Sequence, residues 1–571
     1  MKQLRKRVIA ILLLALILVG SFSGCAIFGG NLGAPPPQVT PAPAATPIPI
    51  DVTVPRDGRL SVSFVPEDTL NPYTSRSRDN LAVSGLMHEG LWALDENFTT
   101  TPTLARGLAT LDGRRYIIEI RDDITFHNGD RLTVSDVIYS LNRARTSALF
   151  ENRLRIVSGY NRRYDAEGQA LDFEMEVLFN RTHGNLPALF TFPIIQRGTS
   201  GQRVPPGTGP FRYPGDEDEG LPRLLRFDAH DYADYLPVDT IYLAEVVTIE
   251  QMTAHFNSGL LDILALDITT TGEPQLRGNR ELRQYEASLI DFVGFNIRRP
   301  ETGRLEVRRA ISLAIDRAYI TDNIMRGHAV ASPLPLHPTL FYYDHALAAQ
   351  FDFDLERARG ILRGDTLLRP PSPWPGDDEV ETPPPPPPPV EPLPEDDPSE
   401  EYPYDEADAP EAPERAPTQL TLLVAGGNTT RMEVAVYIAA SISALGYQVI
   451  IEDLPYDQFM QALRAGNFDL FYGQVRLQPD FDLTEILFGN LSFGGMDTLI
   501  NPRLVDDFLA SGQTDRGLRA STMSAAILEE APLVVIGFRN LAVATQRGVV
   551  AGMRPTQENI YHNVWNWIVD V

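Results

Sequence analysis

The chain of 571 residues has one cysteine, Cys25, and its lysines are confined to Lys2 and Lys6. A single cysteine excludes any disulfide within the chain, so an exported form must be stabilised by a large buried core. The formal net charge of −27 repels the phosphates of nucleic acids, which argues against that class of partner.

Sequence motifs of enzymes and metal sites are also missing. The nine histidines include no H-E-x-x-H and no pair at i, i+4, and there is no G-x-S-x-G. The stretch AGGNTT (425–430) lacks the lysine of a phosphate loop. We therefore expect no enzymatic activity, no cofactor and no metal site built by the protein alone.

Four basic residues near the N-terminus precede an apolar run, Val8 to Val19, that is too short to span a membrane. This pattern predicts a signal peptide over residues 1–24. The small residues before Cys25 are similar to a lipobox, although Phe22 stands where leucine is usual, so the resemblance implies lipidation of Cys25. Residues 25–50, rich in Pro, Ala, Gly and Thr, are expected to form a flexible tether to the membrane.

The length and the 43% of hydrophobic residues predict two or three domains. Residues 369–417 are rich in proline and acidic residues, with an unbroken proline run from Pro383 to Pro389. Such a segment buries too little apolar surface to offset the entropy of ordering, so we expect a disordered insertion within a domain.

After this insertion, apolar runs alternate with helical patterns. The predicted elements are a strand at 420–427, a helix that a Thr430–Glu433 capping box opens and that runs to Gly446, a strand at 447–454, a helix from Asp457 to Gly466, and a strand at 468–475. This βαβαβ order predicts a parallel, doubly wound sheet with helices on both faces. Ligands bind beyond the carboxyl ends of such strands, so Gly427-Asn428, Pro455-Tyr456 and Gly473 to Arg476 are candidate lining.

The stretch ITFHNGDRLTVSDVIYSLNRAR (124–145) reads as a strand end, an Asn128-Gly129 turn and a helix capped by Thr133 with Asp136. Val134, Val137, Ile138 and Leu141 would form one apolar face of that helix. We interpret the unit as scaffold, and His127 and Asp130 as structural turn residues.

The same stretch resembles the extracellular solute-binding proteins of the peptide and nickel class, family 5. Further motifs follow in order: LNP (70–72), HEGLWALD (88–95), PTLA (102–105), GTGPF (207–211), GLLDI (259–263), VRRAISLAIDR (307–317) and FDLERARGILR (353–363).

The resemblance implies an α/β, two-lobed fold like that of periplasmic binding proteins (type II, large cluster), with mixed doubly wound sheets joined by two hinge crossings. Lobe I would comprise residues 51–295 and 538–571, with an extra N-terminal subdomain at about 85–206. Lobe II would comprise residues 296–537.

In peptide-binding members of the family, the loop after the third strand carries a tryptophan and then two aspartates, of which the first pairs with the ligand's ammonium group. In the matching stretch YGQVRLQPDFD (472–482), Gln474 replaces the tryptophan, Leu477 stands in place of the first aspartate, and Asp480 matches the second. We hypothesise that Arg476 orients an anionic group of the ligand. The alternative is a structural ion pair of Arg476 with Asp480 or Asp482.

Further candidates for ligand contact are Gln474, Gly473, Asp480, Tyr456 and Asn428 near the strand ends. In the first lobe, Asn71 and Tyr73 are candidates, with loop structure as the alternative. Trp92, Phe471 and Tyr472 could offer flat apolar surfaces, although core packing is their commoner fate.

We therefore predict a substrate-binding lipoprotein of an ABC importer that binds a peptide or peptide-like solute and delivers it to a membrane permease. We expect an exported monomer on the outer face of the cytoplasmic membrane, or in the periplasm of a cell with two membranes. Two alternatives stay open: a surface sensor or adhesin on the same clamp, and a protein that binds a nickel complex.

Overall fold

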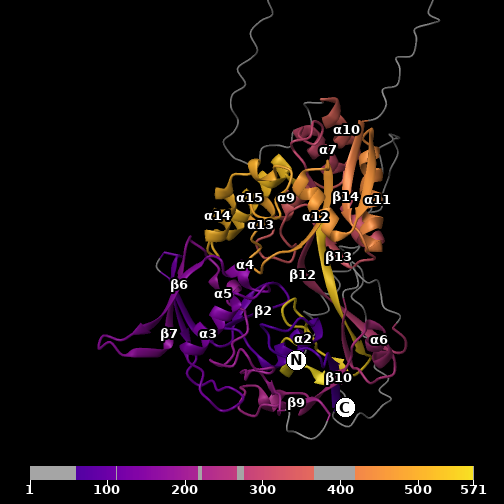
Figure 1. Ribbon diagram of the computed structural model, residues 1–571. Coiled ribbons are helices and arrows are strands. Elements are labelled where there is room, and N and C mark those ends of the chain that lie inside the picture. The colour runs from indigo at the N-terminus through magenta and orange to yellow at the C-terminus, as the bar shows by residue number, and fades with distance from the viewer. Residues whose placement is uncertain (1–58, 111, 216–220, 267–275, 365–417, 570–571) are drawn as a thin grey trace, which may run out of the picture. The chain divides into compact units, whose positions relative to one another are not determined.

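The computed structural model describes residues 59–110, 112–215, 221–266, 276–364 and 418–569 (Figure 1). The predicted signal peptide, Cys25, the tether and the insertion at 369–417 lie outside these residues and stay predictions. In the described part of the chain, no helix has both the length and the apolar character needed to cross a membrane.

A mixed sheet of eleven strands runs through the described chain. Its strands are rich in β-branched and aromatic residues, which suit a pleated, buried surface. In order along the sheet they are β15 (Tyr447–Leu454), β14 (Thr418–Ala425), β16 (Leu470–Arg476), β12 (Arg280–Phe295), β17 (Leu533–Gln546), β11 (Ile263–Leu266), β1 (Arg59–Phe64), β10 (Thr240–Glu245), β9 (Arg223–Arg226) and β8 (Phe211–Arg212), with β13 (Ala329–Ala331) paired to β17.

The two longest strands, β12 and β17, pass from one hydrophobic core to another. Side chains of β12 up to residue 287 pack with β1 and β10, and those from residue 290 pack with β14 and β16. On β17 the same change occurs between residues 538 and 541. We propose these points as the passages between two lobes. The passage on β17 lies near the one predicted at 537–538. The passage on β12 lies earlier in the chain than the one predicted at 295–296.

The βαβαβ unit after residue 417 is confirmed. β14 pairs in parallel with both β15 and β16. Leu422 and Val424 of β14 pack with α11 (Thr429–Ser443), while Leu423 and Ala425 pack with α12 (Tyr456–Ala465). Since successive side chains of a strand point to opposite faces, the two helices cover opposite faces of the sheet, as Figure 1 shows.

The predicted starts of these two helices were wrong by one or two residues. α11 is capped by Asn428, whose side chain accepts from the N–H of Arg431, and not by Thr430. α12 begins after Pro455, which places Asp457 inside its first turn. Gly466 ends α12 in the left-handed region (φ 70°), as predicted.

The helix and its cap predicted in the 124–145 unit are confirmed. Its role as scaffold stays a prediction, since Ile124 and Thr125 line the cavity described below. Thr133 and Asp136 form the capping box of α3 (Val134–Ala144). The predicted strand at 124–126 is only an isolated bridge between Thr125 and Arg131. His127 accepts the N–H of Gly207 through Nδ1 (3.4 Å) and donates through Nε2 to the carbonyl of Gly209 (3.0 Å), which joins two of the family motifs.

The second sheet and the remaining elements complete the fold. The four-stranded antiparallel sheet that α3 covers runs β4 (Ala105–Thr110), β5 (Arg115–Ile120), β7 (Ala170–Phe179) and β6 (Val157–Tyr164). Two small pairs are β2 (Trp92–Leu94) with β3 (Thr100–Pro102) and β18 (Val550–Ala551) with β19 (Ile568–Val569). The other helices are α2 (Arg78–Met87), α4 (Glu151–Leu154), α5 (Leu186–Leu189), α6 (Ile249–Asn257), α7 (Leu305–Ala314), α8 (Arg317–Tyr319), the π-helix η2 (Ile320–Ile324), α9 (His345–Ala349), α10 (Leu355–Arg363), α13 (Thr484–Leu487), α14 (Pro502–Ala510), α15 (Arg516–Glu530), and the 3₁₀ turns η1 (Ala233–Tyr235), η4 (Met496–Thr498) and η5 (Val564–Asn566).

Candidate functional site

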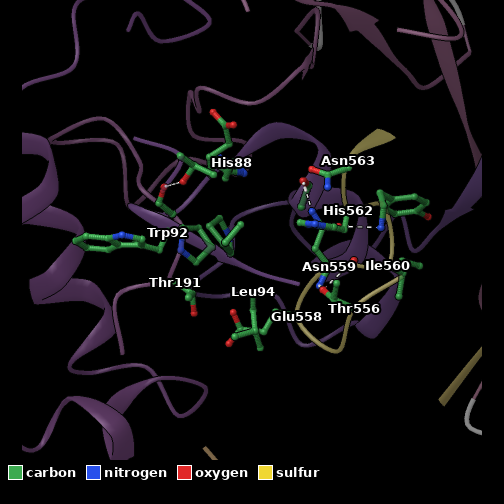
Figure 2. Close-up of a pocket in the computed structure, with 18 of the residues that line it drawn as sticks. His88, Trp92, Leu94, Thr191, Thr556, Glu558, Asn559, Ile560, His562 and Asn563 are labelled. Atoms are coloured by element: carbon green, nitrogen blue, oxygen red, sulfur yellow. Dashed lines mark hydrogen bonds between the residues drawn. The ribbon is translucent and has the colours of Figure 1, made fainter. Parts of the chain in front are cut away.

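A cavity of about 750 Å³ is the candidate site. Small-solute pockets typically enclose about 300–1,000 Å³, so this volume suits a small molecule or short peptide. Its wall comes from distant parts of the chain: residues within 72–104, 121–153, 191–232, 476–479 and 541–565, with Ala265 and Tyr285. Figure 2 shows His88, Trp92 and Thr191 on one side, and Asn559, His562 and Asn563 from the C-terminal tail on the other.

Aromatic rings form part of the cavity wall. Tyr232 and Trp565 stack with ring centroids 4.4 Å apart and an interplanar angle of 9°, and the ring of His230 lies 5.7 Å from Trp565. Trp92 and Phe227 also line the cavity. Such rings offer flat apolar surfaces with few constraints on the shape of the ligand.

The charged groups of the wall are largely paired. Glu89 accepts from Thr208 Oγ1 (2.9 Å) and contacts His230 Nε2 (3.4 Å). Arg153 and Glu558 form an ion pair of 2.7 Å. Burial lowers the pKa of His88 to about 4, so this histidine is neutral at pH 7.

Of the predicted ligand-contact residues, Arg476 and the aromatic candidate Trp92 line this cavity. Arg476 is the polar one. It is the last residue of β16, and Leu477, Gln478 and Pro479 continue the wall from there. The prediction that the loop after the third strand reaches a ligand site thus has a geometric basis at residues 476–479. A contact between Arg476 and a ligand stays a prediction.

Gln474 and Gly473 precede Arg476 on β16 and lie inside the fold. The carbonyl of the Gln474 side chain accepts from Nη2 of Arg431 on α11 (2.8 Å). A Cβ at Gly473 would come within 2.4 Å of the Phe292 ring, so this glycine permits close packing of β16 on β12. Neither residue lines the cavity.

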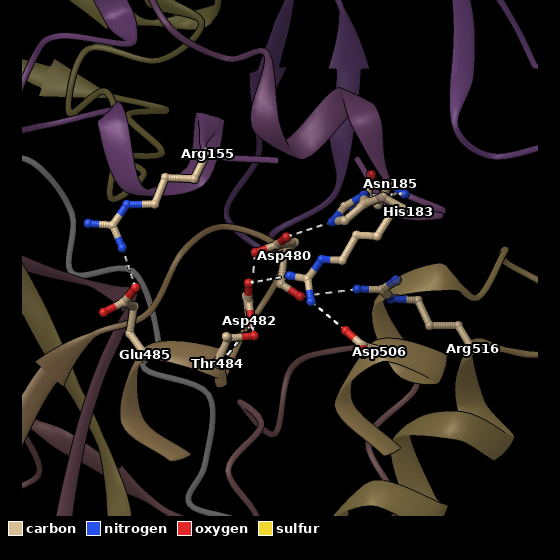
Figure 3. A network of polar contacts seen from close by, with 10 residues as sticks. Arg155, His183, Asn185, Asp480, Asp482, Thr484, Glu485, Asp506 and Arg516 are labelled. Atoms are coloured by element: carbon tan, nitrogen blue, oxygen red, sulfur yellow. Dashed lines mark hydrogen bonds and ion pairs between the residues drawn. The ribbon is translucent and has the colours of Figure 1, made fainter. Parts of the chain in front are cut away.

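Asp480 is buried beside the cavity, and its carboxylate is hydrogen-bonded to another residue of this chain (Figure 3). Its carboxylate lies 2.9 Å from Nε2 of His183, and both side chains are 2% exposed. Burial acts to raise the pKa of Asp480, but the hydrogen bond from His183 holds it below its usual value. Asp482, the other alternative partner of Arg476, forms an ion pair with Arg181 (3.3 Å).

The remaining predicted residues also lie off the cavity wall. Asn71 is fully buried and donates to the carbonyls of Ser200 and Gln202, and Tyr73 donates to the carbonyl of Pro193. Asn428 caps α11, and Tyr456 is exposed at the start of α12. Their roles as ligand contacts stay predictions.

Sequence reasoning missed most of the wall. Trp92 was the one aromatic candidate that lines the cavity; Arg153, Thr191 and the C-terminal segment TQENIYHNVW (556–565) were not predicted. The signal in that segment was a dense mixture of aromatic, amide and histidine side chains after the last long strand. Within the described residues, no group of three or more His, Cys, Asp or Glu could hold a metal ion.

Comparisons with known proteins connect this chain with a family of binding proteins. Residues 99–367 match the model of the bacterial extracellular solute-binding proteins, family 5 Middle. The oligopeptide-binding protein AppA of Bacillus subtilis is 20% identical over 53% of this chain and 59% of its own length. Protein XP55 of Streptomyces lividans is 23% identical over 78% of this chain and 76% of its own length. The match thus spans about three fifths of AppA and three quarters of XP55.

Solved structures share the fold. AppA of Bacillus subtilis in complex with a nonapeptide superposes with a TM-score of 0.56 at 17% identity, over 90% of this chain and 99% of that one. The ABC transporter substrate-binding protein CtaP of Listeria monocytogenes gives a TM-score of 0.65 at 14% identity, with the same coverage. The predicted fold class, a two-lobed α/β binding protein, is confirmed. Over residues 99–367 the chain thus resembles the bacterial extracellular solute-binding proteins, family 5, and it shares the two-lobed fold of the solved structures.

Proposed function

We propose that this protein captures a peptide or peptide-like small solute in the cavity and delivers it to the membrane permease of an ABC importer. Proteins similar to this chain are substrate-binding components of ABC transporters and bind oligopeptides or nickel complexes, which supports this class of function. The observation that carries the proposal is the cavity of about 750 Å³, whose wall combines aromatic rings with paired charges from distant parts of the chain.

Capture would occur by closure of two lobes. The 476–479 segment and the N-terminal half of the chain line the same cavity, so a solute that touches both favours the closed form. Contacts beside the cavity would stabilise such a closed form. His183 pairs with Asp480 and Arg155 pairs with Glu485 (2.5 Å) (Figure 3), and the N–H of Gly184 donates to the carbonyl of Leu509 (2.7 Å).

Export and anchoring belong to the same proposal. The apolar run before Cys25 supports a signal peptide and a lipid anchor, which would keep the binding protein close to its permease. We propose a monomer in which lobe II lies between the passages on β12 (residues 287–290) and β17 (residues 538–541), and lobe I comprises the parts of the folded chain before and after them. Labelling with radioactive palmitate, with Cys25→Ala as control, tests the anchor.

The solute can be identified directly. The purified protein is denatured and the released small molecules are analysed by mass spectrometry; thermal unfolding is then measured with each candidate, because a ligand of the folded state raises the transition temperature by mass action. We expect peptides among the released molecules. A protein that releases no solute, and that no peptide stabilises, would contradict the proposal.

Arg476 provides a second test. If it orients an anionic group, Arg476→Ala weakens binding of that solute with little change in stability, because the side chain is exposed. Unchanged affinity would show that its role is structural.

A further inference from the structure

Arg153 lies in the cavity wall with part of its guanidinium unpaired. It is on α4, and its side chain is 3% exposed. Nη1 donates to Glu558 (2.7 Å), and the guanidinium lies over the ring of Phe150, 4.9 Å from its centroid. Both neighbours line the cavity, as does Arg153 itself, so the guanidinium sits at the wall.

The unpaired atoms are Nε and Nη2. Each exposes less than 1 Å² and has no hydrogen-bond partner among the described residues. Buried donors are nearly always paired, and leaving those of a charged group unpaired is costly. Such an orphan edge, in the wall of a cavity, indicates that a further partner belongs there.

The geometry of the edge selects the partner. The N–H groups of Nε and Nη2 lie in the guanidinium plane and point outward from the same edge, and their spacing matches the two oxygens of a carboxylate. The bond from Nη1 to Glu558 and the stacking on Phe150 hold that plane in one orientation. The edge is therefore preorganised for bidentate binding.

A second orphan polar group lies on the same wall. The hydroxyl oxygen of Thr191 is buried and has no partner within the described chain. The next residue, Phe192, packs against Phe150, with ring centroids 6.5 Å apart, so the chain at Thr191 passes close to the ring under Arg153. Thr191 offers another hydrogen-bond donor to a group bound there.

We propose that the Nε–Nη2 edge of Arg153 binds a carboxylate of the solute. This rests on the proposed function and narrows its substrate class to solutes with a free carboxylate. Since water does not reach the edge, the charged hydrogen bonds form with little competition from solvent. Wall side chains must shift to admit the carboxylate. Arg121, another cavity arginine, already pairs with Asp123 (2.8 Å) and Asp231 and is not available in this way.

The test combines variants of the protein with variants of the ligand. The variants are Arg153→Gln, Arg153→Lys, and the double variant Arg153→Gln/Glu558→Gln, which leaves no unpaired charge if the single change impairs folding. Arg145→Gln is the matched control, because Arg145 is exposed and does not line the cavity. The probes are di- to hexapeptides, each made with a free C-terminal carboxylate and as the amide, and the non-peptide acids benzoate, glutarate and citrate. Affinity is measured by titration calorimetry.

We expect the full-length wild-type protein to bind acids about 10- to 100-fold more tightly than the matching amides, since two charge-assisted hydrogen bonds are lost. In Arg153→Gln and in the double variant, acids bind more weakly by the same factor and amidation makes no further difference. Arg153→Lys keeps the positive charge but loses the two parallel N–H groups, so its affinity for acids should lie between those of the wild type and Arg153→Gln. Arg145→Gln should bind as the wild type does.

The outcomes separate this proposal from the broader one. Peptides that bind equally well as acids and amides, with or without Arg153, overturn the carboxylate site and leave the proposed function standing. Binding of benzoate, glutarate or citrate that depends on Arg153, without binding of any peptide, supports the site and overturns the peptide as substrate. Failure of both probe sets to bind the folded wild-type protein overturns both proposals.

Discussion

Removal of His183 should destabilise this protein more than its single hydrogen bond suggests. The N–H of Asn185 donates to Nδ1 of His183 (3.2 Å), which leaves Nε2 to donate to the buried carboxylate of Asp480. In His183→Ala that carboxylate keeps only the N–H of Asp482 (3.3 Å) and the field of Arg516. Leaving a buried polar group without its hydrogen-bond partner costs about 1–3 kcal/mol, and more when the group is charged, so we expect a loss of about 3 kcal/mol.

A double-mutant cycle isolates the contact from other effects of the change. Asp480→Asn keeps an acceptor for His183 and removes the charge, so it should cost about 1 kcal/mol. In the double variant His183→Ala/Asp480→Asn no charge is left buried, and we expect a coupling energy of about 1–2 kcal/mol. The measurement is urea-induced unfolding followed by circular dichroism and fluorescence, with the midpoint and slope compared for each variant.

A matched control comes from the neighbouring contact of Arg155 with Glu485, whose side chains are 54% and 34% exposed. It joins the same two parts of the chain, but exposed ion pairs contribute about 0–1 kcal/mol, so Arg155→Gln should change stability little. The reasoning is refuted if His183→Ala costs no more than Arg155→Gln, or if the coupling energy is below about 0.5 kcal/mol.

Three further predictions concern single groups. Arg539→Met should cost about 3–5 kcal/mol of unfolding free energy in urea titrations, because it leaves the carboxylate of Asp291, 1% exposed, without its ion pair of 2.6 Å; a loss below about 1 kcal/mol would contradict this. Asn428→Ala should cost about 1 kcal/mol, as loss of a helix cap does, while Thr430→Ala should be close to neutral in the same assay. A larger loss for Thr430→Ala than for Asn428→Ala would support the Thr430 capping box predicted from the sequence instead. The pKa of His88 is lowered by burial to about 4, so the unfolded chain takes up the proton first as the pH falls below about 6.5, and stability should drop by about 2 kcal/mol between pH 6.5 and 5. His88→Gln should remove that part of the pH dependence, and an unchanged slope would exclude His88 as its source.

Local patterns in the sequence were sufficient to predict several helices and strands. The alternation of apolar runs and helical stretches predicted β14, α11, β15, α12 and β16, and the Thr133 box predicted α3. These patterns are readable because they depend on neighbours within a few residues. The cap of α11 was missed since Asn428 and Thr430 are both good caps, and the choice depends on where β14 leaves the sheet.

The site was predictable only in part. Arg476 stands at the end of a parallel strand, and that position alone brought it into the cavity wall. Asp480, Asn71 and Tyr73 look equally suited to ligand contact from sequence, yet their polar atoms bond to His183, Ser200 and Pro193.

The sequence by itself determined the βαβαβ unit and the turn at Asn128-Gly129, because each depends on residues close to one another along the chain. Only the tertiary structure decided which polar side chains face the cavity and which are already bonded. Arg153 and its partner Glu558 are 405 residues apart, and the unpaired edge of Arg153 exists only because packing removed water without supplying a partner. Burial and pairing arise from contacts between distant segments, and no local pattern encodes them.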